Sequence, residues 1–82
     1  MILLKKVNIH KASHYTQPSG TEIQLLLWEA PEGTHGYPFC VERMVNGKFQ
    51  EGLYGLPIKS ARERFAEWQG FERKIGSKAL LS

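Results

Sequence analysis

Histidine, cysteine and glutamate are the residue types in this chain that could bind a metal or act on a substrate. His10 and His14 are four residues apart, a useful ligand spacing on a helix, but their surroundings predict a strand that runs into a loop. His35 and Cys40 complete the set, yet no Cys-x-x-Cys pair and no carboxylate partner supports a site. We therefore expect no metal and no other cofactor, with the histidines on the surface and the thiol buried.

Covalent and acid–base catalysis have as little support. A nucleophilic Cys40 needs a base and an orienting acid, but it lies in the middle of an expected strand, where cysteine behaves as a small hydrophobic side chain. Glu42 and Glu51 face each other in the expected hairpin, and facing carboxylates raise one pKa. A strained pair compensated by Arg or Lys explains the same residues. The glycines of segment 33–36 lack the lysine and the helix of a phosphate-binding loop, so we expect a chain that is not an enzyme.

A group of basic and aromatic side chains is the strongest candidate for a site. In the expected hairpin, every second side chain points to the same face of the sheet, and one face receives both cations and aromatic rings. Cations bind phosphates, and exposed rings stack on bases. We therefore expect a small non-enzymatic binding protein that contacts nucleic acid through a basic and aromatic sheet face. The predicted contact residues are Phe39, Arg43, Lys48, Gln50, Tyr54 and Arg62.

A protein-interaction module is the alternative function. Trp28 and Leu26 project from the second face of the most apolar run, which one helix does not have to cover. Exposed Trp, Tyr and Arg are the usual anchors of protein interfaces, so Trp28, Leu26 and Glu42 are the predicted protein-binding residues. A homodimer through an open sheet edge is a further prediction, because the first strand has few charged guards beyond Lys5 and Lys6.

Length, charge and cysteine content limit these functions. The 82 residues (9.4 kDa) with 41% hydrophobic side chains predict a single folded domain over residues 1–82. The formal net charge of +3 is compatible with an anionic partner without establishing one, and one cysteine excludes an internal disulfide. The chain starts with apolar residues followed by charge, the reverse of a secretory signal, and has no run of about 18 apolar residues. We therefore expect a cytoplasmic protein that makes no contact with a membrane.

An antiparallel sheet and a helix are expected to position these side chains. The apolar alternation and the Gly and Pro positions predict an α+β domain: three to four strands in meander order, with one C-terminal helix packed on a face. The expected elements are a first strand within 1–12, a loop over 13–20, further strands within 21–54, a helix over 60–75 and a loose tail at 77–82.

Asn46-Gly47 is the most specific local signal, because this dipeptide favours the positive φ angles of a two-residue hairpin turn. The turn predicts the pairs Val45–Lys48, Met44–Phe49, Arg43–Gln50, Glu42–Glu51 and Cys40–Leu53. Cys40, Met44, Phe49 and Leu53 then form the core face. The like-charge glutamate pair needs either a basic side chain above it or a bulge at Gly52 that shifts the register.

The helix has start and stop signals of its own. Ser60 and Glu63 fit a capping box, which places the N-cap at Ser60. An apolar stripe follows, with three- and four-residue steps: Ile58, Ala61, Phe65 and Trp68. The helix ends either at Gly70 or, if it runs through that glycine, at Gly76.

The run from Val41 to Trp68 resembles a known group of DNA-binding domains. These combine a sheet with a helix, as in the arm-binding domains of tyrosine recombinases and the plant APETALA2-type domain. The likeness rests on the turn, on a glycine after it and on small and aromatic helix residues: Asn46-Gly47-Lys48, Gly52, Ala61, Phe65 and Ala66. It implies DNA contacts from sheet-face residues at the positions of Trp28, Arg43 and Lys48.

The segment from Val41 to Lys48 also looks like the hairpin of small type I-F anti-CRISPR proteins. There too a preceding strand ends in an aromatic residue followed by Glu, as in Trp28-Glu29, and a helix comes afterwards. This resemblance implies a phage or mobile-element origin and binding to a CRISPR surveillance complex, with Trp28 and Glu42 at the matching positions.

Overall fold

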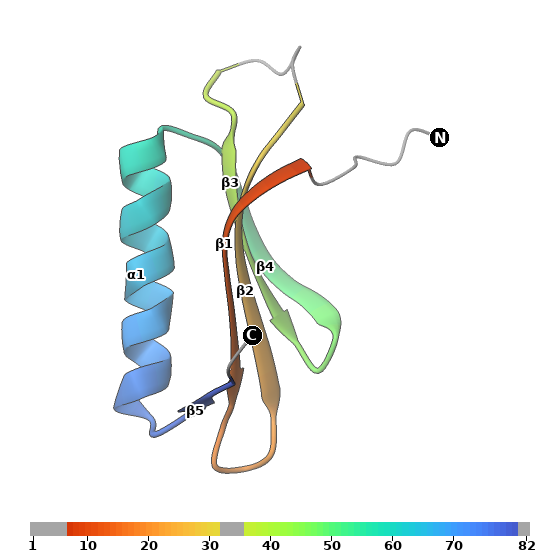
Figure 1. Ribbon diagram of the computed structural model, residues 1–82, viewed down its shortest axis with the longest axis vertical. Coiled ribbons are helices and arrows are strands. Elements are labelled where there is room, and N and C mark those ends of the chain that lie inside the picture. The colour runs from red at the N-terminus through yellow and green to blue at the C-terminus, as the bar shows by residue number, and fades with distance from the viewer. Residues whose placement is uncertain (1–6, 32–35, 81–82) are drawn as a thin grey trace.

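The computed structural model of the protein describes residues 7–31 and 36–80. Over these residues, five strands form one antiparallel sheet, and one helix packs on a face of it (Figure 1). The elements are β1 (Val7–Thr16), β2 (Glu22–Glu29), β3 (Phe39–Val45), β4 (Lys48–Leu56), α1 (Ile58–Lys74) and β5 (Lys78–Ala79). Their spatial order is β4-β3-β2-β1-β5. The α+β class and the meander are therefore confirmed, with one strand more than expected.

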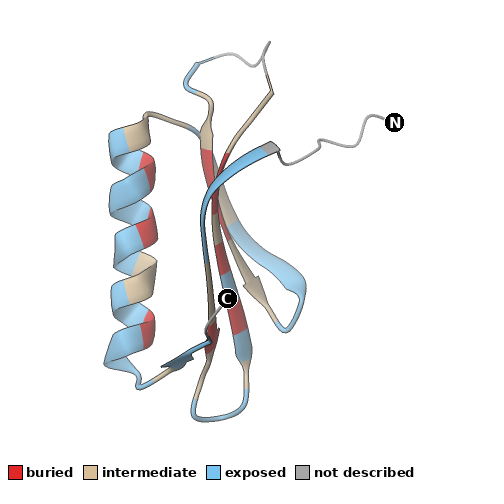
Figure 2. Ribbon diagram, in the orientation of Figure 1, coloured by how far each residue is buried: buried red, intermediate tan, exposed pale blue. Residues whose placement is uncertain are grey.

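One face of β2 supplies the centre of the core. Ile23, Leu25 and Leu27 alternate along the strand and so share a face, and no more than 1% of each is exposed. Ala61 and Phe65 are buried against them from α1. Figure 2 shows the buried stretches of the helix and the sheet facing each other. Burying each large apolar side chain contributes roughly 1.5–3 kcal/mol, so this layer fixes the helix on one face of the sheet.

Strand β1 continues beyond the point at which the sequence predicts a loop. The predicted loop over 13–20 is wrong in its first half, because β1 runs to Thr16 and pairs with β2 over that stretch. Tyr15 explains the difference, since its ring is buried in the core and only 6% exposed. The turn that follows is closed by bonds from the Gln17 amide to the Thr21 carbonyl and from the Gly20 amide to the Gln17 carbonyl. Residues 1–6 of the predicted first strand lie outside the described residues.

The hairpin turn is confirmed, but its register is not. Asn46 and Gly47 both have positive φ, of 50° and 78°, and the predicted pairs Val45–Lys48 and Met44–Phe49 form. A bulge then shifts the register, and the observed pairs are Arg43–Glu51, Glu42–Gly52 and Val41–Leu53. The three other predicted pairs are therefore wrong. The extra residue in β4 lies close to the turn, at Gln50, and it keeps the two glutamates from facing each other.

This one-residue shift changes which side chains share a face. Leu53 pairs with Val41 and packs on the core beneath the helix. Phe49 precedes the shift and pairs with Met44 as predicted, but this pair lies on the face opposite α1, where Phe49 is 57% exposed instead of buried in the core. Cys40 and Met44 lie on that same opposite face, through their pairing with Trp28 and Gln24 of β2. Cys40 is therefore buried as predicted, at 3% exposed, and it shares a face with Met44 and Phe49, but that face is opposite α1 and Leu53 lies on the other side.

The helix starts earlier than the predicted capping box allows. α1 begins at Ile58, its N-cap is Pro57, and no side chain caps it. The Ala61 amide makes the first helical bond, to the Pro57 carbonyl at 2.9 Å. The predicted N-cap at Ser60 is therefore wrong. Ile58 packs against the core as part of the first helical turn, so the helix begins two residues after the end of β4. The apolar stripe that includes Ala61 is confirmed.

The helix ends at the second of its two predicted stops. It passes through Gly70 and reaches its C-cap at Ile75, and Gly76 follows with φ of 84°. The Gly76 amide bonds to the Arg73 carbonyl and the Ser77 amide to the Glu72 carbonyl, which is the pattern of a Schellman cap.

The chain after the cap is not the loose tail that the sequence predicts. Lys78 and Ala79 form β5 on the outer edge of β1, opposite Thr16 and Tyr15. The Leu80 amide adds a bond of 2.8 Å to the His14 carbonyl. The tail prediction is therefore wrong for residues 78–80, and residues 81–82 lie outside the described part of the chain.

Candidate functional site

The structure separates the side chains of the predicted basic and aromatic face. Arg43 lies on the helix side of the sheet, where its Nη2 is 3.3 Å from Oε2 of Glu72 on α1. Tyr54 lies on the opposite side, where its hydroxyl donates to Oε2 of Glu42 at 2.7 Å. Phe39 packs on the helix-side core, with the His10 ring edge-on at 5.4 Å. The ring of Tyr54 and the cation of Arg43 therefore do not share a binding face.

The other predicted contact residues divide in the same way. Gln50 stays with Arg43, accepting a hydrogen bond from its Nη1. Lys48 pairs with Val45, a helix-side core residue, so the register places it on that side too. Arg62 is exposed on α1. Of the six predicted residues, Arg43 and Gln50 are joined by a hydrogen bond.

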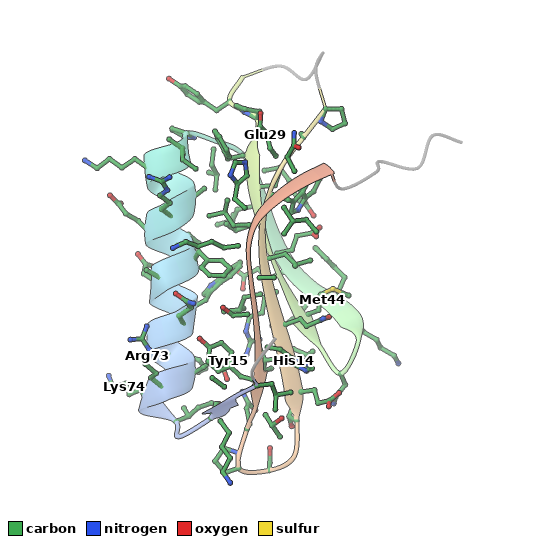
Figure 3. The ribbon with its side chains drawn as sticks, in the orientation of Figure 1. His14, Tyr15, Glu29, Met44, Arg73 and Lys74 are labelled. Carbon is green, nitrogen blue, oxygen red and sulfur yellow. The ribbon has the colours of Figure 1, made fainter. Side chains whose placement is uncertain are left out.

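The face of the sheet opposite α1, here called the open face, has no helix over it in the described chain (Figure 1). Figure 3 shows Tyr15 between the sheet and the helix, and its neighbour His14 on the other side together with Met44. The strand register places these residues on the open face: Ile9, Ala12, His14, Thr16, Glu22, Gln24, Leu26, Trp28, Cys40, Glu42, Met44, Phe49, Tyr54 and Lys78. Most of them are apolar or aromatic.

Trp28 and Glu42 form the buried centre of the open face. Trp28 is only 3% exposed and meets the Tyr54 ring edge-on, with 6.4 Å between centroids. Glu42 is 5% exposed and accepts the Tyr54 hydrogen bond. Gly52, the partner of Glu42 on β4, allows this arrangement, because a Cβ there would lie 2.6 Å from the Tyr54 hydroxyl. The Tyr54 ring thus occupies the space above a glycine.

Two ionisable groups on the open face are shifted towards their neutral forms. Burial raises the pKa of Tyr54 to about 12, and the hydrogen bond to Glu42 adds to the effect. Burial also raises the pKa of the Cys40 thiol, which is 3% exposed and free. A thiol with a raised pKa is a poor nucleophile at neutral pH, so neither group is tuned for nucleophilic attack.

The exposed anchors of this face differ from those that the sequence suggests. Trp28 lies on the predicted face but is buried, and Leu26 is half-buried. Phe49 and Tyr54 are 57% and 53% exposed and lie beside the buried centre formed by Trp28 and Glu42. Sequence reasoning missed Phe49 because it placed the residue in the core. The Met44–Phe49 pair forms as predicted, and the pair lies on the open face because α1 covers the other side of β2, which no local sequence signal reveals.

A buried carboxylate organises the other side of the sheet. Glu72 is fully buried and accepts hydrogen bonds from Gln17 Nε2 (3.1 Å), Ser77 Oγ (2.8 Å) and Arg43 Nη2 (3.3 Å). These donors come from the β1–β2 turn, the segment before β5, and β3. Sequence reasoning missed Glu72, although it lies four residues after Trp68 and continues the buried stripe of the helix.

A groove lies beside this carboxylate on the helix side. It is open to solvent, has a volume of about 550 Å³ and is lined by residues from the last turns of α1 and from β3, β4 and the β1–β2 turn. Its lining is Gln17, Arg43, Gln50, Glu51, Trp68, Phe71 and Ile75. Three of these side chains are apolar and four are polar, so the groove could hold a partly apolar group that also makes hydrogen bonds.

The cations and the apolar face lie on opposite sides of the molecule. The exposed cations of α1 are Lys59, Arg62, Arg64, Arg73 and Lys74, and Figure 3 shows Arg73 and Lys74 on the helix. On the open face the register places one described cation, Lys78, at a corner beside Thr16. The acid Glu22 lies opposite the same Thr16 on β2. Among the described residues, the open face therefore exposes mainly apolar and aromatic side chains and has little positive charge.

Comparison of the chain with protein-family models, curated proteins and solved structures finds no match. The described residues include no group of three or more His, Cys, Asp or Glu side chains that could hold a metal ion, and His35 lies outside them. No helix in the described range has the length and apolar character needed to cross a membrane. What the candidate site can bind is therefore argued from the geometry of its residues.

Proposed function

We propose that this protein is a small non-enzymatic binding protein that docks a protein partner on its open face. The observation that carries the proposal is the gathering of apolar and aromatic side chains, with Phe49 and Tyr54 exposed, around the buried Trp28. The centres of protein interfaces are enriched in aromatic residues and Met and depleted of charge, and their rims are polar. The open face is rich in such side chains, its central acid Glu42 is buried beneath the Tyr54 hydroxyl, and His14 and Gln24 lie beside the apolar residues.

Charge favours a protein partner over nucleic acid at this surface. Binding to a phosphate backbone depends on exposed cations, and Arg43, the central cation of the predicted contact set, lies on the other side against Glu72. A partner with an apolar centre matches the open face better. The anti-CRISPR resemblance of the segment from Val41 to Lys48 suggests a CRISPR surveillance complex as one such partner, and we infer that the protein acts in the cytoplasm.

A photo-crosslinking experiment tests the proposal. A benzoylphenylalanine placed at Phe49 is expected to crosslink a protein partner in the native host, whereas the same group at Tyr37 is expected not to. Tyr37 is the matched control, because it is an aromatic residue exposed to a similar extent (60%) outside the open face. The identified partner is then produced in pure form, and its affinity for the unmodified chain and for two variants is measured.

In that measurement, Tyr54→Ala is expected to weaken partner binding by at least about 2 kcal/mol, as for an interface hot spot. Tyr37→Ala is expected to leave it unchanged. Crosslinks from position 49 to nucleic acid, with affinity that falls steeply as salt rises, would contradict the proposal and favour the nucleic-acid function. Equal binding by Tyr54→Ala and the unmodified chain would also contradict it.

A further inference from the structure

The groove beside Glu72 plays no part in the proposed protein docking, because it lies on the helix side of the sheet. Its volume of about 550 Å³ falls within the range of roughly 300–1,000 Å³ that is typical of small-ligand sites. Such sites combine apolar walls with a few oriented polar groups. Trp68, Phe71 and Ile75 provide the walls here, and Arg43 provides an oriented polar group.

Arg43 is held in one position inside the groove. Its side chain is 14% exposed, with Nη2 bonded to the fully buried Glu72 and Nη1 bonded to Gln50. A guanidinium has five N–H donors, so donors remain for a ligand after these two contacts. The Glu72 carboxylate offsets the positive charge, and the groove also contains the carboxylate of Glu51. Arg43 is therefore placed to donate hydrogen bonds, and the groove has no excess positive charge to attract a phosphate.

The walls offer flat apolar surface together with amides. Phe71 is 53% exposed and Ile75 is 38% exposed, and both lie near Trp68 on the last turns of α1. Gln17 and Gln50 each carry an amide that can both donate and accept. A ligand that uses all of these groups is planar, uncharged and equipped with both donors and acceptors on its edge. Nucleobases have these properties, and proteins bind them by stacking on aromatic rings and by hydrogen bonds to their edges.

We propose that this groove binds a heterocycle of the nucleobase type, which stacks against the aromatic wall at Phe71 and accepts a hydrogen bond from Arg43. Such a base can come from a free nucleoside or from a single-stranded nucleic acid. The site is independent of the open face, since no residue of the groove lies on that face.

Two-dimensional NMR of the unmodified chain tests this site, because the two tryptophans report on the two sides of the sheet. Adenosine, cytidine and uridine, and then short oligo(dA) and oligo(dT), are added to labelled protein. We expect a saturable shift of the Trp68 indole N–H signal, with the Trp28 signal unmoved. The Trp68→Phe variant assigns the two signals.

Phe71→Ala is the decisive variant, because Phe71 is exposed and its removal leaves the buried core intact. It is expected to weaken ligand binding about fivefold or more, as the loss of a base-stacking ring does. Tyr37→Ala and Phe49→Ala are the matched controls and are expected to bind as the unmodified chain does.

Salt dependence separates the two sources of the base. Affinity for oligonucleotides that exceeds nucleoside affinity and falls with salt indicates a single strand, whereas equal, salt-independent affinities indicate a free nucleoside. The proposal is wrong if no ligand shifts the Trp68 signal saturably, or if Phe71→Ala binds unchanged. Neither result affects crosslinking from position 49, so failure of this site and failure of the open-face proposal can be told apart.

Discussion

The Tyr54 side chain occupies the space that a Cβ at position 52 would need, and Gly52 leaves this space open. An added Cβ at Gly52 would lie 2.6 Å from the Tyr54 hydroxyl and 3.0 Å from the Phe49 ring. The missing side chain thus lets one exposed ring reach the buried Glu42 and cover the centre of the open face. The glycine at position 52 therefore affects both the packing of the open face and the pKa of Tyr54.

The pH dependence of Tyr54 gives a test at this scale. Burial and donation to Glu42 raise its pKa from 10.0 to about 12, so the folded state holds this proton more tightly than the unfolded chain does. The resulting stabilisation is complete below pH 10.0 and is lost as the pH rises towards 12. Phenolate absorbance is titrated in the unmodified chain and in Tyr54→Phe, and we expect the difference between the two curves to have its midpoint near pH 12.

Gly52→Ala is expected to displace the Tyr54 ring and to move this midpoint back towards 10.0. Gly70→Ala is the matched control, since a Cβ at Gly70 meets nothing within 4 Å. A Tyr54 midpoint near 10.0 in the unmodified chain would show that the hydroxyl does not donate to Glu42.

At the scale of elements, Glu72 joins parts of the chain that are distant in sequence. Its carboxylate links α1 to Arg43 on β3, to Gln17 in the β1–β2 turn and to Ser77 before β5. The backbone of the same residue accepts the Ser77 amide at the helix cap. The position of the helix end therefore depends on a buried charge as well as on apolar packing.

Removing that carboxylate is expected to be strongly destabilising. Glu72→Ala leaves Arg43, with a side chain only 14% exposed, without its counter-charge, and should lower the free energy of unfolding by about 3 kcal/mol. Glu67→Ala is the control, because its pair with Arg64 is exposed and 3.8 Å long and should change stability by less than about 0.5 kcal/mol. Urea denaturation measures both.

A second variant separates the charge from the packing. Replacing the pair with apolar side chains, as Arg43→Met with Glu72→Leu, is expected to recover most of the lost stability, since no buried charge is left alone. A loss below about 1 kcal/mol in Glu72→Ala would mean that the carboxylate is not essential to the fold.

At the scale of the whole molecule, the sheet has two edges, and both are blunted. The β4 edge carries the bulge near Gln50, and Gly55 with φ of 70°. The β1 edge is covered by β5 at Tyr15 and Thr16 only, and its other end is irregular, with register shifts between Val7 and Lys11. Bulges and covered edges disfavour pairing with another strand.

We therefore expect the predicted edge-to-edge homodimer not to form, and the mass in solution to stay at 9.4 kDa as protein concentration rises. Light scattering after size-exclusion chromatography measures it. A dimer that persists in Phe49→Ala and Tyr54→Ala would contradict this expectation and indicate edge pairing, whereas a dimer abolished by them would place a second copy on the open face.

Several features of the fold could be predicted from the sequence because they depend on neighbours along the chain. Alternating Ile23, Leu25 and Leu27 indicated a buried strand, and Asn46-Gly47 indicated the turn, since both patterns act through local backbone geometry. The apolar stripe that includes Phe65 indicated the helix and the face it buries. These elements, with their order, were enough to predict the α+β class.

The candidate site depended on features that only the tertiary structure decided. The packing of α1 on the Ile23, Leu25 and Leu27 side of β2 left the Met44–Phe49 pair on the open face. One extra residue at Gln50 then brought Leu53 to the helix side, because side chains alternate with a period of two and a single step reverses them. Glu72 is buried only because donors from distant segments converge on it. The sequence by itself therefore determined which elements form, and long-range contacts determined which side chains meet on each face.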